Sequence, residues 1–264
     1  MLSAFRSALK TFAVSPQTFL HLPPLPPSAS SACTHVHVLD SSFNPPTLAH
    51  LSLALSSLSS LSAHPHPTPT NPSNTRLLLL LATQNVDKPT SPAPFEDRLA
   101  MMALLSRSPA ISVPVDIALT KHARFLDKAR DLADAYPGAE QVYLIGYDTL
   151  IRLLDGKYYP TGMGELAKFF KRNQVVCTMR EGAWGEQGQR EFLESVKRGE
   201  REKEGCRREW AQRITLVEGR EEGRGVSSTK VREAVKSGDV NALERLLTKE
   251  VAEYVRERGL YTDV

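Results

Sequence analysis

Two short segments of the sequence carry side chains that can bind phosphate. Residues 40–50 read DSSFNPPTLAH, which places Thr47 and His50 three residues apart, on one face of a helix's first turn. A histidine there can donate a hydrogen bond to a phosphate that gains negative charge during transfer. Residues 226–232 read VSSTKVR, a pattern typical of a helix start. Its hydroxyls, helix terminus and arginine can together hold an anion.

Each segment also has an ordinary structural explanation. A single histidine on a helix is most often an unremarkable surface or core residue. Likewise, Ser-Ser-Thr before an apolar helical pattern is an N-cap signature and needs no ligand. The two motifs in this order, roughly 180 residues apart, are far more specific than either one alone. We therefore expect both to belong to one phosphate site.

Both motifs resemble those of a known superfamily. SSFNPPTLAH resembles the (G/S)xFxPxTxxH signature of the nucleotidylyltransferases, and VSSTKVR resembles their ISSTxxR motif. The form with Asn-Pro and threonine is typical of nicotinamide mononucleotide adenylyltransferases, and the chain looks most like their divergent fungal branch. The resemblance covers residues 34–180 and 213–261. It implies an α/β, Rossmann-like fold with a parallel sheet, helices on both faces and a carboxyl-terminal helical subdomain.

The resemblance also implies a reaction. AMP would pass from ATP to nicotinamide mononucleotide, and also to nicotinic acid mononucleotide, to form NAD and pyrophosphate. Such transfers depend on positioning and charge neutralisation more than on covalent help. Mg²⁺ would accompany ATP, held by the nucleotide and water, so we expect no metal ligands from the protein.

The implied ATP site combines both motifs with the sequence GYD at the end of an expected strand. The backbone around Ser42 and Phe43 would meet phosphate, and Asp148 can accept hydrogen bonds from a ribose or base. The family usually has glycine at the position of Ser41, and serine is small enough to replace it. The candidate ATP-binding residues are Ser42, Phe43, Thr47, His50, Gly146, Asp148, Ser227, Ser228, Thr229 and Arg232.

Further candidates lie between the motifs. Lys88 follows an aspartate, as a lysine does in the family loop that approaches substrate phosphates. We expect the catalytic residues to be His50, Lys88 and Arg232. Where the family often has a tryptophan that stacks on the nicotinamide ring, this chain has two tyrosines, and a cationic ring also stacks on tyrosine. The candidate acceptor-binding residues are Tyr158, Tyr159, Arg98 and Arg180.

Two other functions stay open. A different nucleotidylyltransferase, such as a pantetheine-phosphate or cytidylyl enzyme, would share the first motif, although the NPP-T form disfavours it. A regulatory protein that binds or hydrolyses ATP without transferring AMP is the second alternative. Ser41 and the tyrosine pair, which depart from the family pattern, motivate that reading.

Each motif is expected to follow a strand and to open a helix, and segments with strand patterns alternate with segments with helix patterns along the sequence. This alternation predicts a parallel sheet covered on both faces. The expected strands are 34–39, 76–82, 111–115, 141–145, 174–179 and 213–217. The expected helices are 47–61, 95–107, 123–136, one after Gly146, and those of 227–261, broken near Gly238 and ending at Gly259.

Two parts of the chain fall outside the motifs. Residues 1–33 combine a first segment with a Pro-rich spacer, ahead of the main domain, 34–264. Apolar residues recur at helical spacing in that segment, which favours an amphipathic helix over a mitochondrial targeting sequence. Residues 181–210 are strongly charged and look like a helical insertion on the surface, peripheral to the sheet.

Composition limits the class of protein. The 264 residues are 41% hydrophobic and 24% charged, as in an ordinary soluble domain. The net charge of +3 gives no reason to expect a nucleic-acid partner, and no apolar run is long enough for a membrane span. The three cysteines lie far apart, which indicates a reducing compartment, and we expect the cytoplasm or nucleus.

Overall fold

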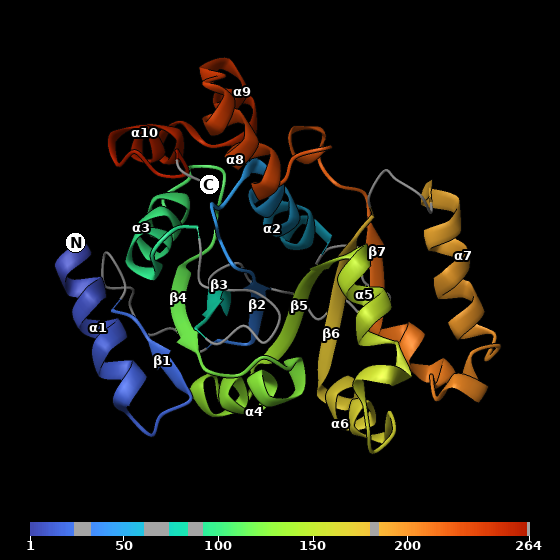
Figure 1. The fold of residues 1–264 in the computed structure, drawn as a ribbon. Coiled ribbons are helices and arrows are strands. Elements are labelled where there is room, and N and C mark those ends of the chain that lie inside the picture. The colour runs from blue at the N-terminus through green and yellow to red at the C-terminus, as the bar shows by residue number, and fades with distance from the viewer. Residues whose placement is uncertain (24–32, 61–73, 84–91, 180–184, 263–264) are drawn as a thin grey trace.

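The computed structural model describes residues 1–23, 33–60, 74–83, 92–179 and 185–262, and a seven-stranded sheet forms its centre (Figure 1). The strands are β1 (Phe19–His21), β2 (His35–Asp40), β3 (Thr75–Ala82), β4 (Val115–Thr120), β5 (Glu140–Gly146), β6 (Asn173–Thr178) and β7 (Ile214–Val217). Their order is β1-β4-β3-β2-β5-β6-β7, and each neighbouring pair is parallel except β1 with β4. The order reverses between β2 and β5, where open α/β sheets bind ligands beyond the carboxyl ends of their strands.

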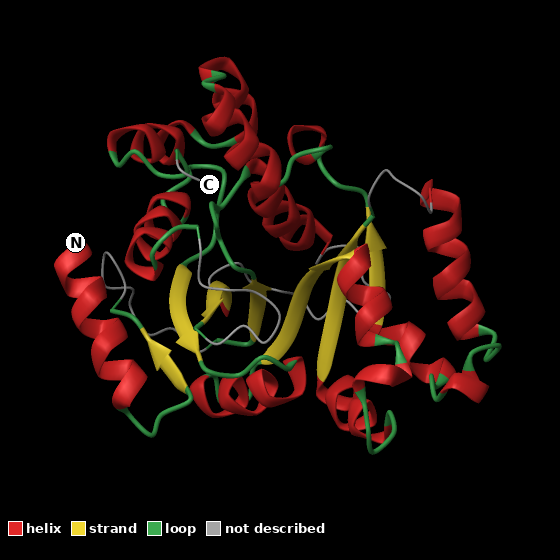
Figure 2. Ribbon diagram, viewed as in Figure 1, coloured by secondary structure: helices red, strands yellow, loops and turns green. Residues whose placement is uncertain are grey.

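Helices cover both faces of the sheet (Figure 2). They are α1 (Leu2–Val14), α2 (Leu48–Ser60), α3 (Phe95–Leu105), α4 (Phe125–Ala135), α5 (Tyr147–Leu153), α6 (Gly164–Arg172), α7 (Gly185–Lys197), α8 (Ser228–Ser237), α9 (Val240–Leu246) and α10 (Lys249–Glu257). Successive strand residues point to opposite faces, so Val38 packs in one apolar cluster and Leu39 in the other. The predicted Rossmann-like α/β fold is confirmed. Within the described ranges, no helix is long and apolar enough to cross a membrane.

One predicted strand was misplaced. We expected it over 111–115, but β4 begins only at Val115. Pro114 explains the difference, because proline has no N–H to donate to a sheet and rarely lies inside a central strand. The strand also contains Asp116, a charged residue of a type depleted in strands. Arg76 of β3 binds that carboxylate through two hydrogen bonds of 2.5 Å, so the buried charge is paired.

The amino-terminal segment packs against the main sheet. Phe5 and Phe12 of α1 are buried in the same apolar cluster as Leu39 and Leu77 of the central strands, which confirms the predicted amphipathic helix. The following strand, β1, pairs antiparallel with β4 and was not predicted. Its three residues are too few to give a periodic signal in the sequence.

The charged segment is partly integrated into the core, so the expectation of a peripheral surface insertion was wrong for its later residues. Its helix is confirmed over 185–197, but Val196, Cys206 and Trp210 are buried. The Trp210 ring stacks on Phe170 of α6, with centroids 5.4 Å apart. A few apolar residues, widely spaced among many charges, hid this packing from the sequence pattern.

The carboxyl-terminal helices form a third apolar cluster beside α3, and a buried carboxylate fixes them there. Asp97 of α3 accepts hydrogen bonds from the Tyr254 hydroxyl at 2.7 Å and from Arg258 Nε at 3.0 Å. The predicted break at Gly238 is confirmed, because this residue ends α8 with a φ of 71°. These contacts hold α10 against α3, and Val231 and Ala234 of α8 pack in the same apolar cluster.

Replacing Trp210 tests whether residues 185–213 belong to the core. Trp210→Ala should lower the free energy of unfolding by about 3–5 kcal/mol, because it removes a buried ring and leaves a cavity. Urea unfolding followed by circular dichroism measures this difference. Trp210→Phe keeps an aromatic ring against Phe170 and should lose less than half as much. An alanine variant as stable as the parent would show that this packing contributes nothing.

Candidate active site

The two phosphate motifs meet at the carboxyl edge of the sheet, where the strand order reverses. The first motif follows β2, and α8 of the second lies against it. Ser228 Oγ donates to the Pro45 carbonyl at 2.8 Å, and Arg232 Nη1 donates to the Asn44 carbonyl at 2.9 Å. Two segments far apart in the sequence therefore form one surface, as the motifs predict.

The loop after β2 offers backbone donors to an anion. The N–H groups of Ser42 and Phe43 donate to no group in the part of the chain that the structure describes. Phe43 has a φ of 44°, which is unusual for a residue other than glycine and typically marks a functional constraint. Successive N–H groups in such a turn can form a concave anion site. This agrees with the expectation that this backbone meets phosphate.

His50 is held through both ring nitrogens. Nδ1 lies 3.0 Å from the Thr47 backbone nitrogen and 2.9 Å from Thr47 Oγ1, while Nε2 lies 2.9 Å from Ser41 Oγ. A backbone N–H can only donate, so Nδ1 accepts and the ring hydrogen resides on Nε2. The predicted pairing of Thr47 with His50 is confirmed. The contact with Ser41 was not predicted, because spacing alone does not show that this hydroxyl reaches the ring.

Arg232 binds the loop after β2, and the buried Arg98, whose Nε donates to the Ala93 carbonyl at 2.9 Å, is close enough to feel its charge. Burial lowers the pKa of Arg98, and the nearby positive charge of Arg232 lowers it further, while Tyr261 acts in the opposite direction. Tyr261 is buried and donates its hydroxyl hydrogen to Asn44 Oδ1 at 3.0 Å. A bound anion would relieve the repulsion between the arginines. Sequence analysis did not single out Tyr261, because no spacing in the sequence relates it to the first motif.

A cavity of about 270 Å³ adjoins the start of α8. Gly146 and Thr178, at the carboxyl ends of β5 and β6, line one side, and Ser227 and Lys230 line another. Ser227 caps α8 by accepting a hydrogen bond from the Lys230 N–H at 3.2 Å. Gly146 and Ser227 were both predicted from their motifs. Asp148 is exposed in the first turn of α5 beside this cavity.

The tyrosine pair lies elsewhere. Tyr158 and Tyr159 lie in the segment after α5, a helix about 10 Å long, and neither tyrosine lines the cavity at the start of α8. Tyr158 is exposed, and Lys157 Nζ lies 4.9 Å from its ring centroid. Tyr159 donates to the Leu153 carbonyl at 2.8 Å, and burial raises the pKa of Tyr159 to about 12. Their contact with an acceptor stays a prediction, as do the roles of Lys88 and Arg180, which lie outside the described residues.

A buried ion pair holds the first residue of the first motif against α4. The carboxylate of Asp40, at the end of β2, binds the ammonium of Lys128 in α4. The side chains are 11% and 5% exposed, so the two charges neutralise each other out of water. Sequence analysis did not single out Lys128, because a lysine on a helix is normally a solvated charge.

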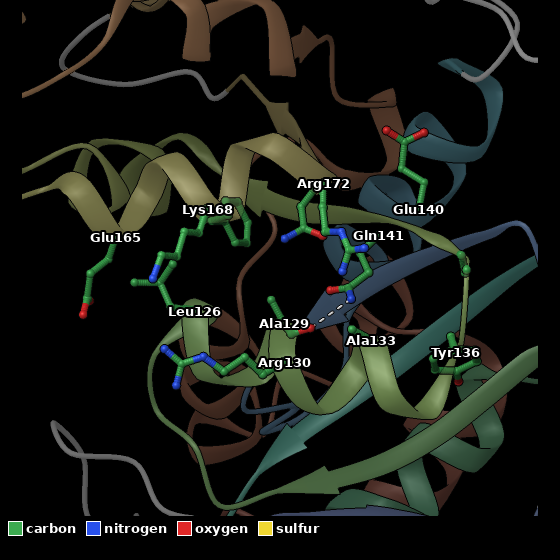
Figure 3. A pocket seen from close by; sticks show the side chains of 14 residues that line it. Leu126, Ala129, Arg130, Ala133, Tyr136, Glu140, Gln141, Glu165, Lys168 and Arg172 are labelled. Atoms are coloured by element: carbon green, nitrogen blue, oxygen red, sulfur yellow. Dashed lines mark hydrogen bonds between the residues drawn. The ribbon is translucent and has the colours of Figure 1, made fainter.

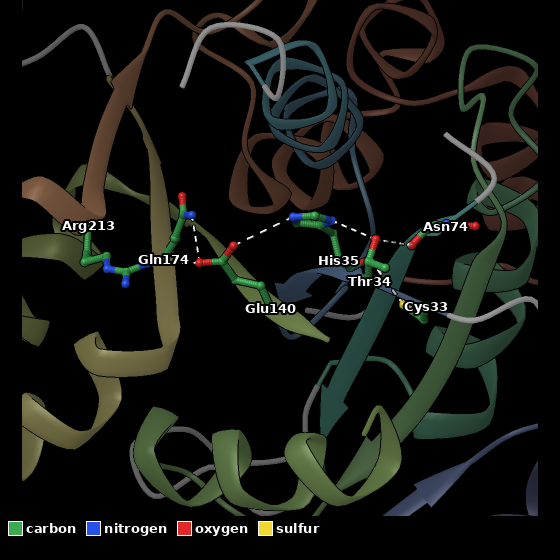
Figure 4. A network of polar contacts seen from close by, with 7 residues as sticks. All are labelled: Cys33, Thr34, His35, Asn74, Glu140, Gln174 and Arg213. Atoms are coloured by element: carbon green, nitrogen blue, oxygen red, sulfur yellow. Dashed lines mark hydrogen bonds and ion pairs between the residues drawn. The ribbon is translucent and has the colours of Figure 1, made fainter. Parts of the chain in front are cut away.

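A larger cavity, of about 420 Å³, lies at the amino edge between α4 and α6 (Figure 3). Arg130, Lys168 and Arg172 surround it, but none of the predicted site residues lines it. Figure 4 shows polar contacts at the same edge, where Glu140 accepts hydrogen bonds from Gln174 and Arg213. These contacts join the starts of β5, β6 and β7, whereas the predicted phosphate motifs meet at the opposite, carboxyl edge, where the candidate site is.

The donor groups at the candidate site fit phosphate better than a metal ion. They are backbone N–H groups, hydroxyls, an imidazole and guanidinium groups, all of which can donate to anionic oxygens. Within the described ranges, no group of three His, Cys, Asp or Glu side chains could hold a metal ion.

Known proteins resemble the chain in sequence and fold. The Cytidylyltransferase-like family model matches residues 38–234. A Schizosaccharomyces pombe protein named "Putative nicotinamide mononucleotide adenylyltransferase" is 36% identical over 225 residues, which cover 84% of each chain.

Two solved structures share the fold. Plasmodium falciparum nicotinic acid mononucleotide adenylyltransferase complexed with NaAD superimposes with a TM-score of 0.56, and complexed with APC with a TM-score of 0.57. Each is 13% identical and covers 86% of this chain and 97% of its own. Such low identity supports the fold alone, whereas the family follows from the sequence matches. The chain belongs to the cytidylyltransferase-like family and, within it, to the nicotinamide mononucleotide adenylyltransferases.

Proposed function

We propose that this protein transfers AMP from ATP to nicotinamide mononucleotide, forming NAD and pyrophosphate. The observation that carries the proposal is the contact of Ser228 and Arg232 with the loop after β2, which unites two phosphate motifs at the switch point of the sheet. The relative from S. pombe, whose name assigns it to the same activity, supports this proposal. Nicotinic acid mononucleotide is proposed as a second acceptor.

The reaction is an in-line displacement at phosphorus. A phosphate oxygen of the acceptor forms a bond to the α-phosphorus of ATP, the bond from that phosphorus to the β-phosphate bridge breaks, and pyrophosphate leaves with the electron pair. The protein must align the two phosphates and stabilise the added negative charge. The N–H groups of Ser42 and Phe43, the hydrogen-bonded pair of His50 and Ser41, and the Arg232 guanidinium are suited to that task.

The remaining parts of the site have separate tasks. The cavity between Gly146 and Ser227 would hold the nucleoside part of ATP, because it adjoins the phosphate donors and opens at the strand ends. Arg98 adds positive charge near Arg232. Mg²⁺, bound by phosphate oxygens and water, would neutralise the charge of the leaving pyrophosphate. Lys88 is proposed to approach the phosphates from the loop after β3.

One assay separates this function from its alternatives. Purified protein is incubated with Mg-ATP and, in turn, nicotinamide mononucleotide, nicotinic acid mononucleotide and phosphopantetheine, with CTP replacing ATP in a further arm. Formation of NAD and pyrophosphate in equal amounts supports the proposal. Dephospho-CoA or a cytidylyl product would assign a different nucleotidylyltransferase. ADP alone, or ATP binding without any product, would assign the regulatory protein.

Removing the imidazole should slow the transfer. His50→Ala should lower kcat by at least about a hundredfold while the fold is kept, because the preorganised hydrogen-bond donation from the pair of His50 and Ser41 to the transferring phosphates is lost. His50→Gln, which keeps an N–H donor on a flexible chain, should lose less. Steady-state kinetics and a thermal melt of each variant provide the measurement. A folded alanine variant with nearly normal turnover would remove His50 from the catalytic group.

The acceptor prediction is tested at the exposed tyrosine. Tyr158→Ala should raise the KM for the mononucleotide roughly 5- to 30-fold, about 1–2 kcal/mol of stacking, and leave the KM for ATP nearly unchanged. The ring face under Lys157 is already occupied, so Lys157 must move or the acceptor must use the other face. Tyr159→Phe, which removes only the hydroxyl bonded to Leu153, is the control and should change neither KM. A rise confined to the ATP KM would show that Tyr158 serves the other substrate.

A further inference from the structure

Ser41 occupies the position where related enzymes usually have glycine, and its hydroxyl takes part in the site. Ser41 Oγ lies 2.9 Å from His50 Nε2, the ring nitrogen that would otherwise face a phosphate directly. Because the Thr47 N–H holds Nδ1 as an acceptor, Nε2 carries the hydrogen and donates it to Ser41. The donor that the family presents to phosphate is therefore directed at a hydroxyl in this chain.

The serine hydroxyl can pass this hydrogen bond onward. Its oxygen accepts from His50, so its own hydrogen is free to donate, and no acceptor for it lies within reach in the described part of the chain. Ser41 is only half-buried and precedes Ser42, which is exposed and has an unused backbone N–H. The hydroxyl thus lies at the start of the loop that offers donors to an anion.

We propose that Ser41 is the group that donates to the substrate phosphate, with His50 behind it as the positioning residue. The chain of donors runs from the Thr47 N–H to His50 Nδ1, from Nε2–H to Ser41 Oγ, and from Oγ–H to a phosphate oxygen. No proton is transferred and no covalent bond changes in the protein. Each hydrogen bond polarises the next, so the hydroxyl becomes a stronger donor than an isolated serine. The proposal rests on the proposed function for its substrate.

The opposite role is that Ser41 restrains His50 and keeps it from the phosphate. The two roles predict different effects of the same substitutions. In a relay, Ser41→Ala removes the terminal donor and leaves a methyl group in its place, so turnover falls. In a restraint, Ser41→Gly frees the imidazole to reach the phosphate and turnover rises.

A double-mutant cycle between Ser41 and His50 tests the relay. We expect Ser41→Ala to lower kcat about 10- to 100-fold, and Ser41→Ala combined with His50→Ala to be hardly slower than the worse single variant, because both break one chain. Ser41→Gly should lie between Ser41→Ala and the parent, since the imidazole then reaches phosphate itself. The relay would be overturned if the loss of kcat in the double variant equalled the product of the two single losses. A normal kcat in Ser41→Ala, or a kcat above that of the parent in Ser41→Gly, would also overturn it.

Controls separate this role from folding and from the proposed function. Ser106→Ala removes a half-buried serine hydroxyl bonded only to the Ala103 carbonyl and should leave kcat unchanged. The affinity of the parent and of each variant in the cycle for Mg-ATP is then measured by calorimetry, because ATP binding does not require AMP transfer. If the parent makes no dinucleotide but Ser41 and His50 are coupled in ATP binding, the proposed function fails and the relay holds. If the parent makes NAD, but the effects of the Ser41 and His50 substitutions are independent in both kcat and ATP affinity, the relay fails and the proposed function holds.

Discussion

The candidate site depends on the docking of α8 onto the loop that follows β2. Ser228 and Arg232 donate to the carbonyls of Pro45 and Asn44, so the second motif uses backbone oxygens of the first. The carbonyls of Asn44 and Pro45 are thus paired with α8, whereas the N–H groups of Ser42 and Phe43 donate to no group in the described part of the chain and can serve an anion. Neither motif is a complete phosphate site without the other, because one supplies N–H donors and the other fixes how they point.

The chain end serves this docking as well. Asp97 of α3 binds Tyr254 of α10 and Arg258, the residue that follows α10, and Tyr261 reaches Asn44 in the first motif. The buried carboxylate and the tyrosine hydroxyl therefore connect three segments that are distant in sequence. Their contacts keep the helical subdomain beside α3, so its position helps to set the geometry of the loop after β2.

Sequence reasoning predicted the sheet and the motifs well, because Leu77 to Leu81 and the NPP-T segment carry strong local patterns. It failed where a long-range contact sets the role of a residue. Lys128 looks like a surface charge until α4 places it on Asp40, and Trp210 lies in a segment whose charges outnumber its apolar residues. Spacing likewise puts Thr47 beside His50, but only the folded loop brings Ser41 to the other ring nitrogen.

The short strand β1 has a consequence for how the molecule behaves in concentrated solution. Without it, β4 would present a row of unpaired backbone groups at the side of the sheet, and such a row recruits strands from other molecules. The antiparallel pairing of β1 with residues 118–120 occupies the carboxyl half of that row. Because β1 has only three residues, it offers little new edge for a foreign strand to join. The amino-terminal segment thus covers this edge of the sheet and opposes edge-to-edge strand pairing between molecules.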